Sequence, residues 1–404
     1  MFRYLFCNIK YLSNKSQIKQ IKTFSICKQT FLPTTSFYLP KMSSCFTSIQ
    51  NPSSGGRKIK HKNIKSVNSK TDDLKKKVNE DELKYSKLFE SDPTNSAACF
   101  NWGEALASQE KFEEAIEKYK KATEINPNFW EAYYSWGNVL YYLGNYDEAF
   151  DKYQKTIDIN PNDSEIYKAW AELLFRLDQD KEAFQKLQRA IEVNPQESEA
   201  YLIWGDRLHA LEQYEEAVEK YQKAIDVNPT FSGAYLNLGN TLLTQEKYDE
   251  AIEKYEKVKE IDPENPEVYF NLGIALANKD KIEEAVSMFE LAAEYKPKYT
   301  RAYLMWGYFL FTLRRYDEAA ERFQDITQFN PENITAYYYL AESLGKLGRY
   351  EDGSYVYITA LQKFSKEKWD FQQVVQDERI LKNPKHLFRY LRNTIKDRWP
   401  ISFD

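Results

Sequence analysis

The chain has few of the residues that carry metal or redox chemistry, with four cysteines and three histidines in 404 residues. No two cysteines form a C-x-x-C pair, and none of His61, His209 and His386 has a ligand or triad partner at a usable spacing. Glycine-rich phosphate loops are absent, and no run approaches the roughly 20 apolar residues of a membrane span. These absences argue against a disulfide framework, a zinc site, a nucleotide-binding loop and a transmembrane helix.

Acidic residues are missing from the first 71 positions, which hold thirteen Lys or Arg. The rest of the chain carries 43 basic and 61 acidic residues, so the formal net charge of −5 conceals a basic segment on an acidic body. Such a segment, also rich in Ser, is typical of a disordered tail or of an organelle transit peptide. We expect a cytoplasmic protein, with a mitochondrial-type transit peptide as the alternative and Met42 as a second candidate start.

Prolines mark a fixed period in the acidic body. Eight of them follow one another at intervals of 34 residues: Pro93, Pro127, Pro161, Pro195, Pro229, Pro263, Pro297 and Pro331. A period of this length indicates stacked copies of one small unit, in place of a single core around one active site. Because proline cannot continue a helix, each unit is expected to end there.

Two helical faces recur in every unit. The units begin at Ser96, Trp130, Ser164, Ser198, Ser232, Pro266, Thr300 and Ile334. Positions 4, 7, 8 and 11 lie on one face of a first helix, and positions 20, 24 and 27 lie on one face of a second helix. Small residues at positions 8 and 20 let the two helices approach closely. Neither helix can bury its apolar face alone, so the sequence predicts an all-α fold of stacked helix pairs.

The pattern resembles the tetratricopeptide repeat (TPR). Its motif is clearest in Tyr201-x2-Trp204-Gly205-x2-Leu208, then Ala217-x3-Tyr221, then Pro229. The resemblance implies a right-handed superhelical solenoid of antiparallel helix pairs. A pentatricopeptide RNA-binding array is a competing interpretation, but it lacks this glycine, alanine and proline pattern.

The expected domains follow from this frame. A disordered tail or targeting segment covers residues 1–71, and a capping helix or degenerate repeat covers 72–95, with Thr71 as its N-cap. Capping helices are expected at 368–404. The eight repeats are expected at 96–129, 130–163, 164–197, 198–231, 232–265, 266–299, 300–333 and 334–367.

Catalysis is not expected. Paired carboxylates recur at positions 18 and 19 and precede a lysine at position 23, which is typical of ion pairing on a helix surface. The 37 residues after the eighth repeat are too few to bury a catalytic core. We therefore expect a non-enzymatic protein without a cofactor, a metal or a small-molecule substrate.

The resemblance also implies that positions 2, 5, 6, 9, 12 and 13 of the first helices line a concave groove. The groove residues predicted to contact a partner are Tyr134, Asn138, Tyr141, Lys168, Glu172, Arg176, Asp206, Asn237, Asn240, Phe270, Asn271, Arg301 and Tyr308. Acidic side chains in repeats three and four favour a basic ligand. Asparagines in repeats five to seven, among apolar side chains predicted to be exposed, are expected to hold the backbone of an extended peptide. Leu236 and Met305 replace two cations of the clamp by which some TPR proteins grip chaperone carboxylates, so that clamp is not expected.

These features predict a protein–protein interaction scaffold or adaptor that binds an extended or helical segment of a partner protein in the groove. The alternative is a nucleic-acid or anionic-surface factor that acts through the basic tail. A third hypothesis joins the two, with the tail occupying the acidic part of its own groove. Nucleic acid is otherwise not an expected ligand, and the sequence leaves the oligomeric state open.

Overall fold

The computed structural model describes residues 64–364, 383–399 and 401, with only the backbone described for 64–77. Every regular element in these residues is a helix, so the predicted all-α helical-repeat fold is confirmed. The predicted tail before residue 64, residues 365–367 of the predicted eighth repeat, and residues 368–382, 400 and 402–404 of the predicted C-terminal cap lie outside the described residues.

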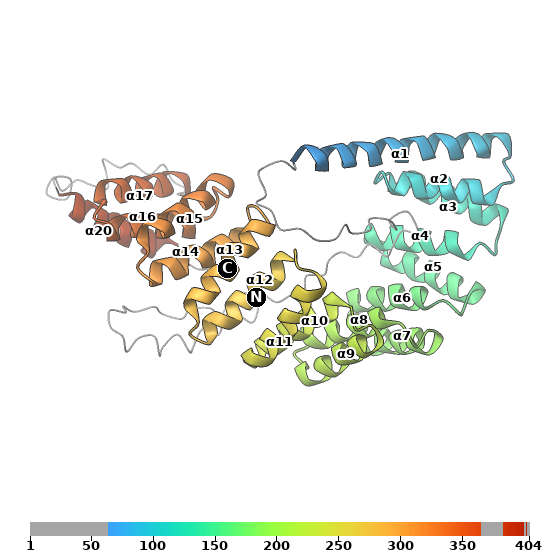
Figure 1. Ribbon diagram of the computed structural model, residues 1–404. Helices are drawn as coiled ribbons and strands as arrows, with labels where there is room; N and C mark the ends of the chain where they lie inside the picture. The colour runs from blue at the N-terminus through green and yellow to red at the C-terminus, as the bar shows by residue number, and fades with distance from the viewer. Residues whose placement is uncertain (1–63, 365–382, 400, 402–404) are drawn as a thin grey trace. The chain divides into compact units, whose positions relative to one another are not determined.

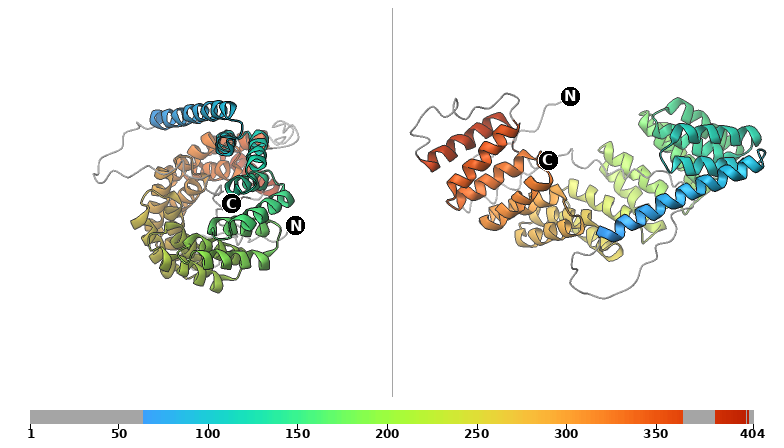
Figure 2. Two further views of the ribbon diagram at one scale, coloured as in Figure 1. Left: turned by 90° about the vertical axis from the view of Figure 1, so that its right-hand side faces the viewer. Right: turned by 90° about the horizontal axis from the view of Figure 1, so that it is seen from above.

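The chain divides into two compact units after Leu211. The first unit contains α1 Ile64–Ser91, α2 Ser96–Ala107, α3 Phe112–Ile125, α4 Trp130–Tyr142, α5 Tyr146–Ile159, α6 Ser164–Arg176, α7 Asp180–Val193 and α8 Ser198–Ala210. The second contains α9 Tyr214–Val227, α10 Ser232–Thr244, α11 Tyr248–Ile261, α12 Pro266–Asn278, α13 Ile282–Tyr295, α14 Thr300–Thr312, α15 Tyr316–Phe329, α16 Ile334–Lys346, α17 Tyr350–Phe364 and α20 Pro384–Arg398. Successive helices pack against one another within each unit, as α2 does against α3 and α12 against α13 (Figures 1 and 2).

A residue in the left-handed conformation at position 15 ends the first helix of every 34-residue repeat. Its φ lies between 55° and 80° in all eight repeats: at Glu110, Gly144, Asp178, Glu212, Glu246, Asp280, Arg314 and Gly348. In the first repeat, the amide of Glu110 donates to the Ala107 carbonyl at 2.9 Å, and the amide of Lys111 donates to the Leu106 carbonyl at 3.0 Å. These bonds satisfy the last carbonyls of the first helix and turn the chain into the second helix.

Glycine at position 8 makes room for the aromatic ring at position 24. A Cβ atom added to Gly239 would lie 2.6 Å from the Tyr255 ring, and one added to Gly273 would lie 2.7 Å from the Phe289 ring. Both rings are fully buried. The predicted close approach of the two helices therefore places the ring of the second helix directly against the backbone of the first.

Tryptophan at position 7 packs less deeply than the sequence predicts. Trp170 is buried, but Trp102, Trp136 and Trp306 keep part of their surface in solvent. Each of the four lies under a basic side chain from position 23 of the second helix, with cation-to-ring distances from 3.5 to 4.6 Å. Such cation–π contacts, worth about 0.5–2 kcal/mol each, let a basic surface residue cover the edge of the core.

The prediction that Thr71 caps the first helix is wrong. Helix α1 runs from Ile64 to Ser91, so Thr71 lies inside it. The acidic residues Asp72 and Asp73 therefore lie inside the helix, and residues 64–71 of the predicted tail belong to the helix as well. The sequence contained no stronger start signal near Ile64, which is why the boundary was placed too late.

Helix α20 covers the last apolar face of the second unit. Its Phe388 ring packs against α17 at Gly353, which leaves room for it: a Cβ atom added to Gly353 would lie 2.7 Å from the ring. Leu391 and Ile395 are buried on the same side. Arg392 pairs with Glu342 of α16 at 3.8 Å. Gly353, at position 20 where the other seven repeats have alanine, therefore makes room for this helix.

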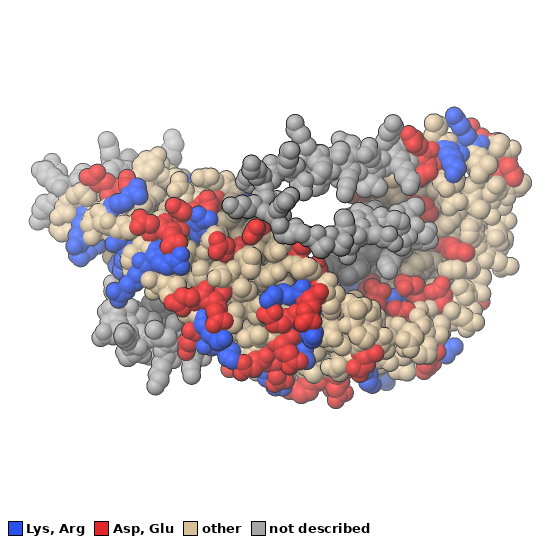
Figure 3. All heavy atoms as spheres, viewed as in Figure 1, with Lys and Arg blue, Asp and Glu red and all other residues tan. Residues whose placement is uncertain are grey.

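Outward faces carry charges of both signs, and acidic and basic side chains are interspersed over the face of the second unit shown in Figure 3. Many pair three residues apart on one helix, as in Arg189 with Glu192 of α7 and Lys257 with Glu260 of α11. Exposed pairs of this kind contribute about 0–1 kcal/mol each. None of the described helices has the length and apolar character needed to cross a bilayer.

Candidate functional site

The thirteen predicted groove residues all lie on first helices, and each unit holds its own set. Helices α4, α6 and α8 of the first unit carry Tyr134, Asn138, Tyr141, Lys168, Glu172, Arg176 and Asp206. Helices α10, α12 and α14 of the second unit carry Asn237, Asn240, Phe270, Asn271, Arg301 and Tyr308. Each set is therefore considered as a separate candidate site.

A hydrogen bond from the tyrosine at position 24 holds the polar side chain at position 9. The four bonds run from Tyr119 to Glu104 (2.7 Å), from Tyr153 to Asn138 (2.7 Å), from Tyr255 to Asn240 (2.9 Å) and from Tyr357 to Glu342 (2.6 Å). Each buried hydroxyl thereby finds an acceptor, which buried polar groups require. The pairing has a sequence signal, because repeats with Tyr at position 24 have Asn, Asp or Glu at position 9.

Glu172 is the exception to this pairing in the first unit. Leu187 stands at position 24 of its repeat and is fully buried, so no hydroxyl is offered to the carboxylate. Glu172 is partly buried and has no hydrogen-bond partner among the described residues. Burial, and next the nearby Glu199 carboxylate, raise the pKa of Glu172 to about 7.

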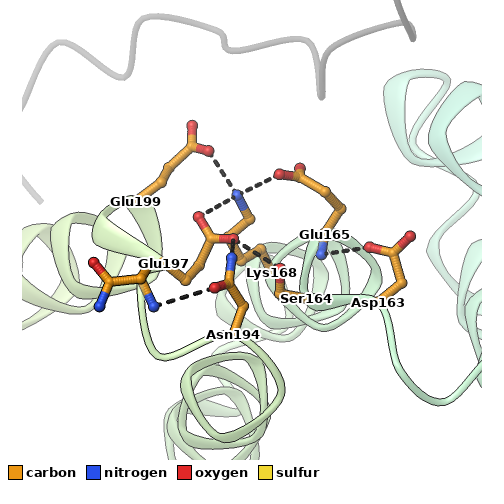
Figure 4. A network of polar contacts seen from close by, with 8 residues as sticks. Asp163, Ser164, Glu165, Lys168, Asn194, Glu197 and Glu199 are labelled. Atoms are coloured by element: carbon orange, nitrogen blue, oxygen red, sulfur yellow. Dashed lines mark hydrogen bonds and ion pairs between the residues drawn. The ribbon is translucent and has the colours of Figure 1, made fainter. Parts of the chain in front are cut away.

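Lys168 lies at the centre of an ion-pair cluster and is only 3% exposed. Its Nζ donates to Glu165 at 2.8 Å, to Glu197 at 3.0 Å and to Glu199 at 2.6 Å (Figure 4). Burial lowers the pKa of Lys168, but attraction to Glu199 and Glu165 more than offsets this, so the pKa lies above its usual value. An ammonium group has three N–H donors, and all three are used here. We therefore do not expect Lys168 to contact a partner.

The same carboxylates raise the question of a metal. Glu165, Glu197 and Glu199 form the one group of acidic, histidine or cysteine side chains in the described part of the chain that is close enough to share an ion. Lys168 Nζ already lies within 3.0 Å of an oxygen of each. The Lys168 ammonium therefore supplies the positive charge at the centre of the cluster, and it would repel a metal ion bound to the same carboxylates.

Two tyrosines of α4 adjoin Glu172. Burial raises the pKa of both Tyr134 and Tyr141, and the Glu172 carboxylate adds to each shift. The Tyr141 hydroxyl accepts a hydrogen bond from Arg176 Nε at 3.1 Å. The first unit thus brings together phenol groups from α4, the unpaired carboxylate of α6 and the Glu199 carboxylate of α8.

In the second unit, Asn240 and Asn271 join neighbouring repeats. The Asn240 Oδ1 atom accepts from the Tyr255 hydroxyl at 2.9 Å and from Asn271 Nδ2 at 2.8 Å. Neither Asn240 Nδ2 nor Asn271 Oδ1 has a hydrogen-bond partner among the described residues. The guanidinium of Arg301 stacks over the Phe270 ring, 4.7 Å from its centroid, and has no carboxylate partner within the described residues.

The prediction of exposed apolar side chains around these asparagines is wrong for position 5. Phe270 is 3% exposed and Leu304 is 1% exposed, and Leu236 is buried as well. Phe270 packs against Phe289 of its own repeat and against Tyr299 at the start of the next. Position 5 therefore fills the interface between helices, and sequence periodicity alone could not separate it from the groove positions next to it.

Comparison with protein families decides the assignment of the chain. A family model described as TPR repeat matches residues 103–141, 205–246 and 239–280, and one described as tetratricopeptide repeat matches residues 130–163. A model described as anaphase-promoting complex, cyclosome, subunit 3 matches residues 278–360. The chain is a tetratricopeptide repeat protein. The resemblance predicted from the sequence is therefore confirmed.

Solved structures of other proteins, two of them described as TPR proteins, are similar to parts of this one. The C-terminal part of a TPR repeat-containing protein from Cytophaga hutchinsonii is 22% identical with a TM-score of 0.49, covering 59% of this chain and 97% of that chain. The pilF protein of Pseudomonas aeruginosa is 22% identical with a TM-score of 0.44, covering 50% of this chain and 92% of that chain. YrrB, described as a TPR protein with an unusual peptide-binding site, is 25% identical with a TM-score of 0.31, covering 54% and 95%. No curated protein matches the chain.

The TPR fold is typically a non-enzymatic scaffold, and TPR proteins bind protein or peptide partners. Membership of this family supports a role as a protein–protein interaction scaffold.

Proposed function

We propose that this TPR protein is an interaction scaffold that holds an extended or helical segment of a partner protein against helices α10, α12 and α14. Support comes from the amide groups of Asn240 and Asn271. One amide hydrogen bond joins the two side chains at 2.8 Å and leaves one donor nitrogen and one acceptor oxygen unpaired among the described residues. A donor beside an acceptor matches the C=O and N–H groups of a peptide backbone.

Arg301 extends this face into the seventh repeat. Its guanidinium carbon lies over the Phe270 ring, 4.7 Å from the centroid, and this contact leaves its N–H groups available to a ligand. The cation favours a partner segment that carries an acidic side chain near the residue held by the asparagines. Asn237, one turn before Asn240 on α10, lies on the same helix face.

The test uses the full-length chain as bait, followed by identification of the bound protein and calorimetry with the bound segment as a synthetic peptide. Asn271→Ala and Arg301→Ala are each expected to weaken binding about tenfold, because each removes a hydrogen-bonding or charged group. Asn278→Ala is the matched control, since its amide donates to the Ile274 carbonyl of its own helix at 2.9 Å. Asn240 is left in place because it accepts the buried Tyr255 hydroxyl.

Far-UV circular dichroism should show the same helix content in all three variants. If the partner binds Asn271→Ala and Arg301→Ala as tightly as it binds the wild type, the proposed face is not where the partner lies.

The second candidate function uses the basic segment at the start of the chain. Its thirteen basic and no acidic residues favour phosphate groups, and such binding weakens steeply with salt. Replacing Arg57, Lys58, Lys60 and Lys62 by serine in the full-length chain removes four of the thirteen positive charges and should then weaken retention on an anionic resin or DNA column, so that the protein elutes at lower salt. Unchanged retention would remove this candidate.

A further inference from the structure

Glu172 has an unusual position among the polar side chains that line the first helices. At the same position of other repeats, Glu104 and Glu342 accept a hydrogen bond from a buried tyrosine hydroxyl. Glu172 has Leu187 in place of that tyrosine and has no hydrogen-bond partner among the described residues. A carboxylate that is partly buried without a partner costs stability, so its presence needs an explanation other than packing.

Neither of the two basic residues one turn from Glu172 on α6, Lys168 and Arg176, forms an ion pair with it in the structure. All three N–H donors of Lys168 are directed to Glu165, Glu197 and Glu199 (Figure 4). Arg176, one turn after Glu172, donates through Nε to the Tyr141 hydroxyl. The cluster of three carboxylates and one lysine has a negative balance, and Glu172 adds a further negative charge beside it.

The groups around Glu172 suit a cation that arrives from outside the repeat array. Tyr134 and Tyr141 of α4 are half-buried beside Glu172, and aromatic rings attract ammonium and guanidinium groups. Glu199 of α8 offers a second carboxylate oxygen. A polyanion would instead meet the repulsion of Glu165, Glu172 and Glu199.

We propose that Glu172 is the binding site for a lysine or arginine side chain of a partner protein, on an extended basic segment that lies across α4, α6 and α8. The proposal rests on the scaffold function but concerns the first unit, whereas Asn271 and Arg301 belong to the second. Burial raises the pKa of Glu172 to about 7, and a bound cation would lower it again. Charge complementarity identifies the occupant as a basic segment.

The experiment measures fluorescence anisotropy of a fluorescein-labelled peptide of four lysine–glycine repeats, titrated with the full-length protein at pH 8 and low salt. Glu172→Gln is expected to weaken binding about tenfold, because it removes a charged hydrogen-bond acceptor without changing the shape of the side chain. Glu182→Gln is the matched control, since it removes the same charge from an exposed position of α7 in the same repeat. Equal affinities of Glu172→Gln and wild type would overturn the proposal.

A second variant tests the missing tyrosine without changing the net charge. Leu187→Tyr combined with Ala171→Gly rebuilds the glycine and tyrosine pair of the other repeats, in which the ring needs a glycine opposite, as at Gly239 and Tyr255. Its hydroxyl would donate to Glu172 and occupy part of the site, so peptide affinity is expected to fall about threefold. An affinity equal to that of the wild type would show that the absent tyrosine does not create the site.

The chain's own basic run, residues 57–62, is the other possible occupant. A variant with serine in place of Arg57, Lys58, Lys60 and Lys62 distinguishes the two. Glu172-dependent peptide binding in the wild type supports a partner, whereas binding that is seen only in this variant overturns the proposal and assigns the site to the chain itself. In either case, partner binding through Asn271 and Arg301 should persist, so failure here is distinct from failure of the proposed function.

Discussion

Replacing Glu172 by glutamine is expected to stabilise the first unit at pH 8 and to leave its stability unchanged near pH 4. The pKa of this carboxyl rises from 4.5 to about 7 in the folded protein, chiefly because of burial and then because of Glu199. Between these two pH values the folded state retains a proton that the unfolded chain has released. The free energy of unfolding of the wild type therefore falls as the pH rises from 4.5 to 7, and glutamine abolishes that loss.

The size of the effect follows from the pKa shift. A shift of roughly 2.5 units corresponds to about 3 kcal/mol. Because the side chain is partly exposed and water screens its charge, about 1–2 kcal/mol is the expected gain at pH 8. The titratable and charged groups that act on it are Tyr134 and Tyr141 of α4, Tyr153 of α5, Glu165, Lys168 and Arg176 of α6, and Glu199 of α8.

The assay is hydrogen exchange with mass spectrometry, read on peptides that cover α6, because repeat arrays open locally and a single global transition is not assured. Glu172→Gln and wild type are compared at pH 8 and again at pH 5, where the difference should shrink. Glu182→Gln is the charge control and should exchange like the wild type. Faster exchange in α6 of Glu172→Gln at pH 8, or an equal slowing in Glu182→Gln, would refute the reasoning.

Two further substitutions test the packing of the units by urea denaturation. Lys168→Met leaves the buried Glu197 without its cation and is expected to cost about 3–5 kcal/mol of local stability. Adding Glu197→Gln to Lys168→Met should recover part of that loss. A urea midpoint unchanged from the wild type would contradict a structural role for the cluster. Gly239→Ala places a Cβ atom 2.6 Å from the Tyr255 ring and should cost about 1–3 kcal/mol, and Tyr255→Leu in the same chain should relieve the clash. If Gly239→Ala unfolds at the same urea concentration as the wild type, close packing is not the reason for the glycine.

Local chemistry was enough to predict the repeat units. Proline can neither donate a helix hydrogen bond nor follow a helical residue easily, so its 34-residue period marks the end of each second helix. Leucine at position 11 and small residues at positions 8 and 20 show the helix period, so the first helices begin at Ser96, Trp130 and their equivalents as framed. Cys99 is buried, as expected for a small core residue in a chain without a disulfide pattern.

The left-handed turn at position 15 was not recognised, because only Gly144 and Gly348 mark it by residue type. In the other six repeats the backbone hydrogen bonds of the turn, not the local preference of Glu, Asp or Arg, hold the residue at positive φ. The start of α1 was placed too late for a related reason, since a boundary without a capping residue leaves no local signal.

The sequence by itself determined the class of fold, the length of the repeat, the helix pairs and the sign of charge on each part of the chain, because these depend on spacings along one helix and on composition. Only the tertiary structure decided which polar side chains form hydrogen bonds or ion pairs within the protein. Lys168 and Glu172 are one turn apart on α6, and both have the sequence position of groove residues. Lys168 pairs with carboxylates of α6 and of the α7–α8 region, whereas Glu172, whose repeat has Leu187 in place of the tyrosine, has no hydrogen-bond partner among the described residues. Pairing of this kind depends on distances between residues about 15 to 30 positions apart, which no local pattern contains.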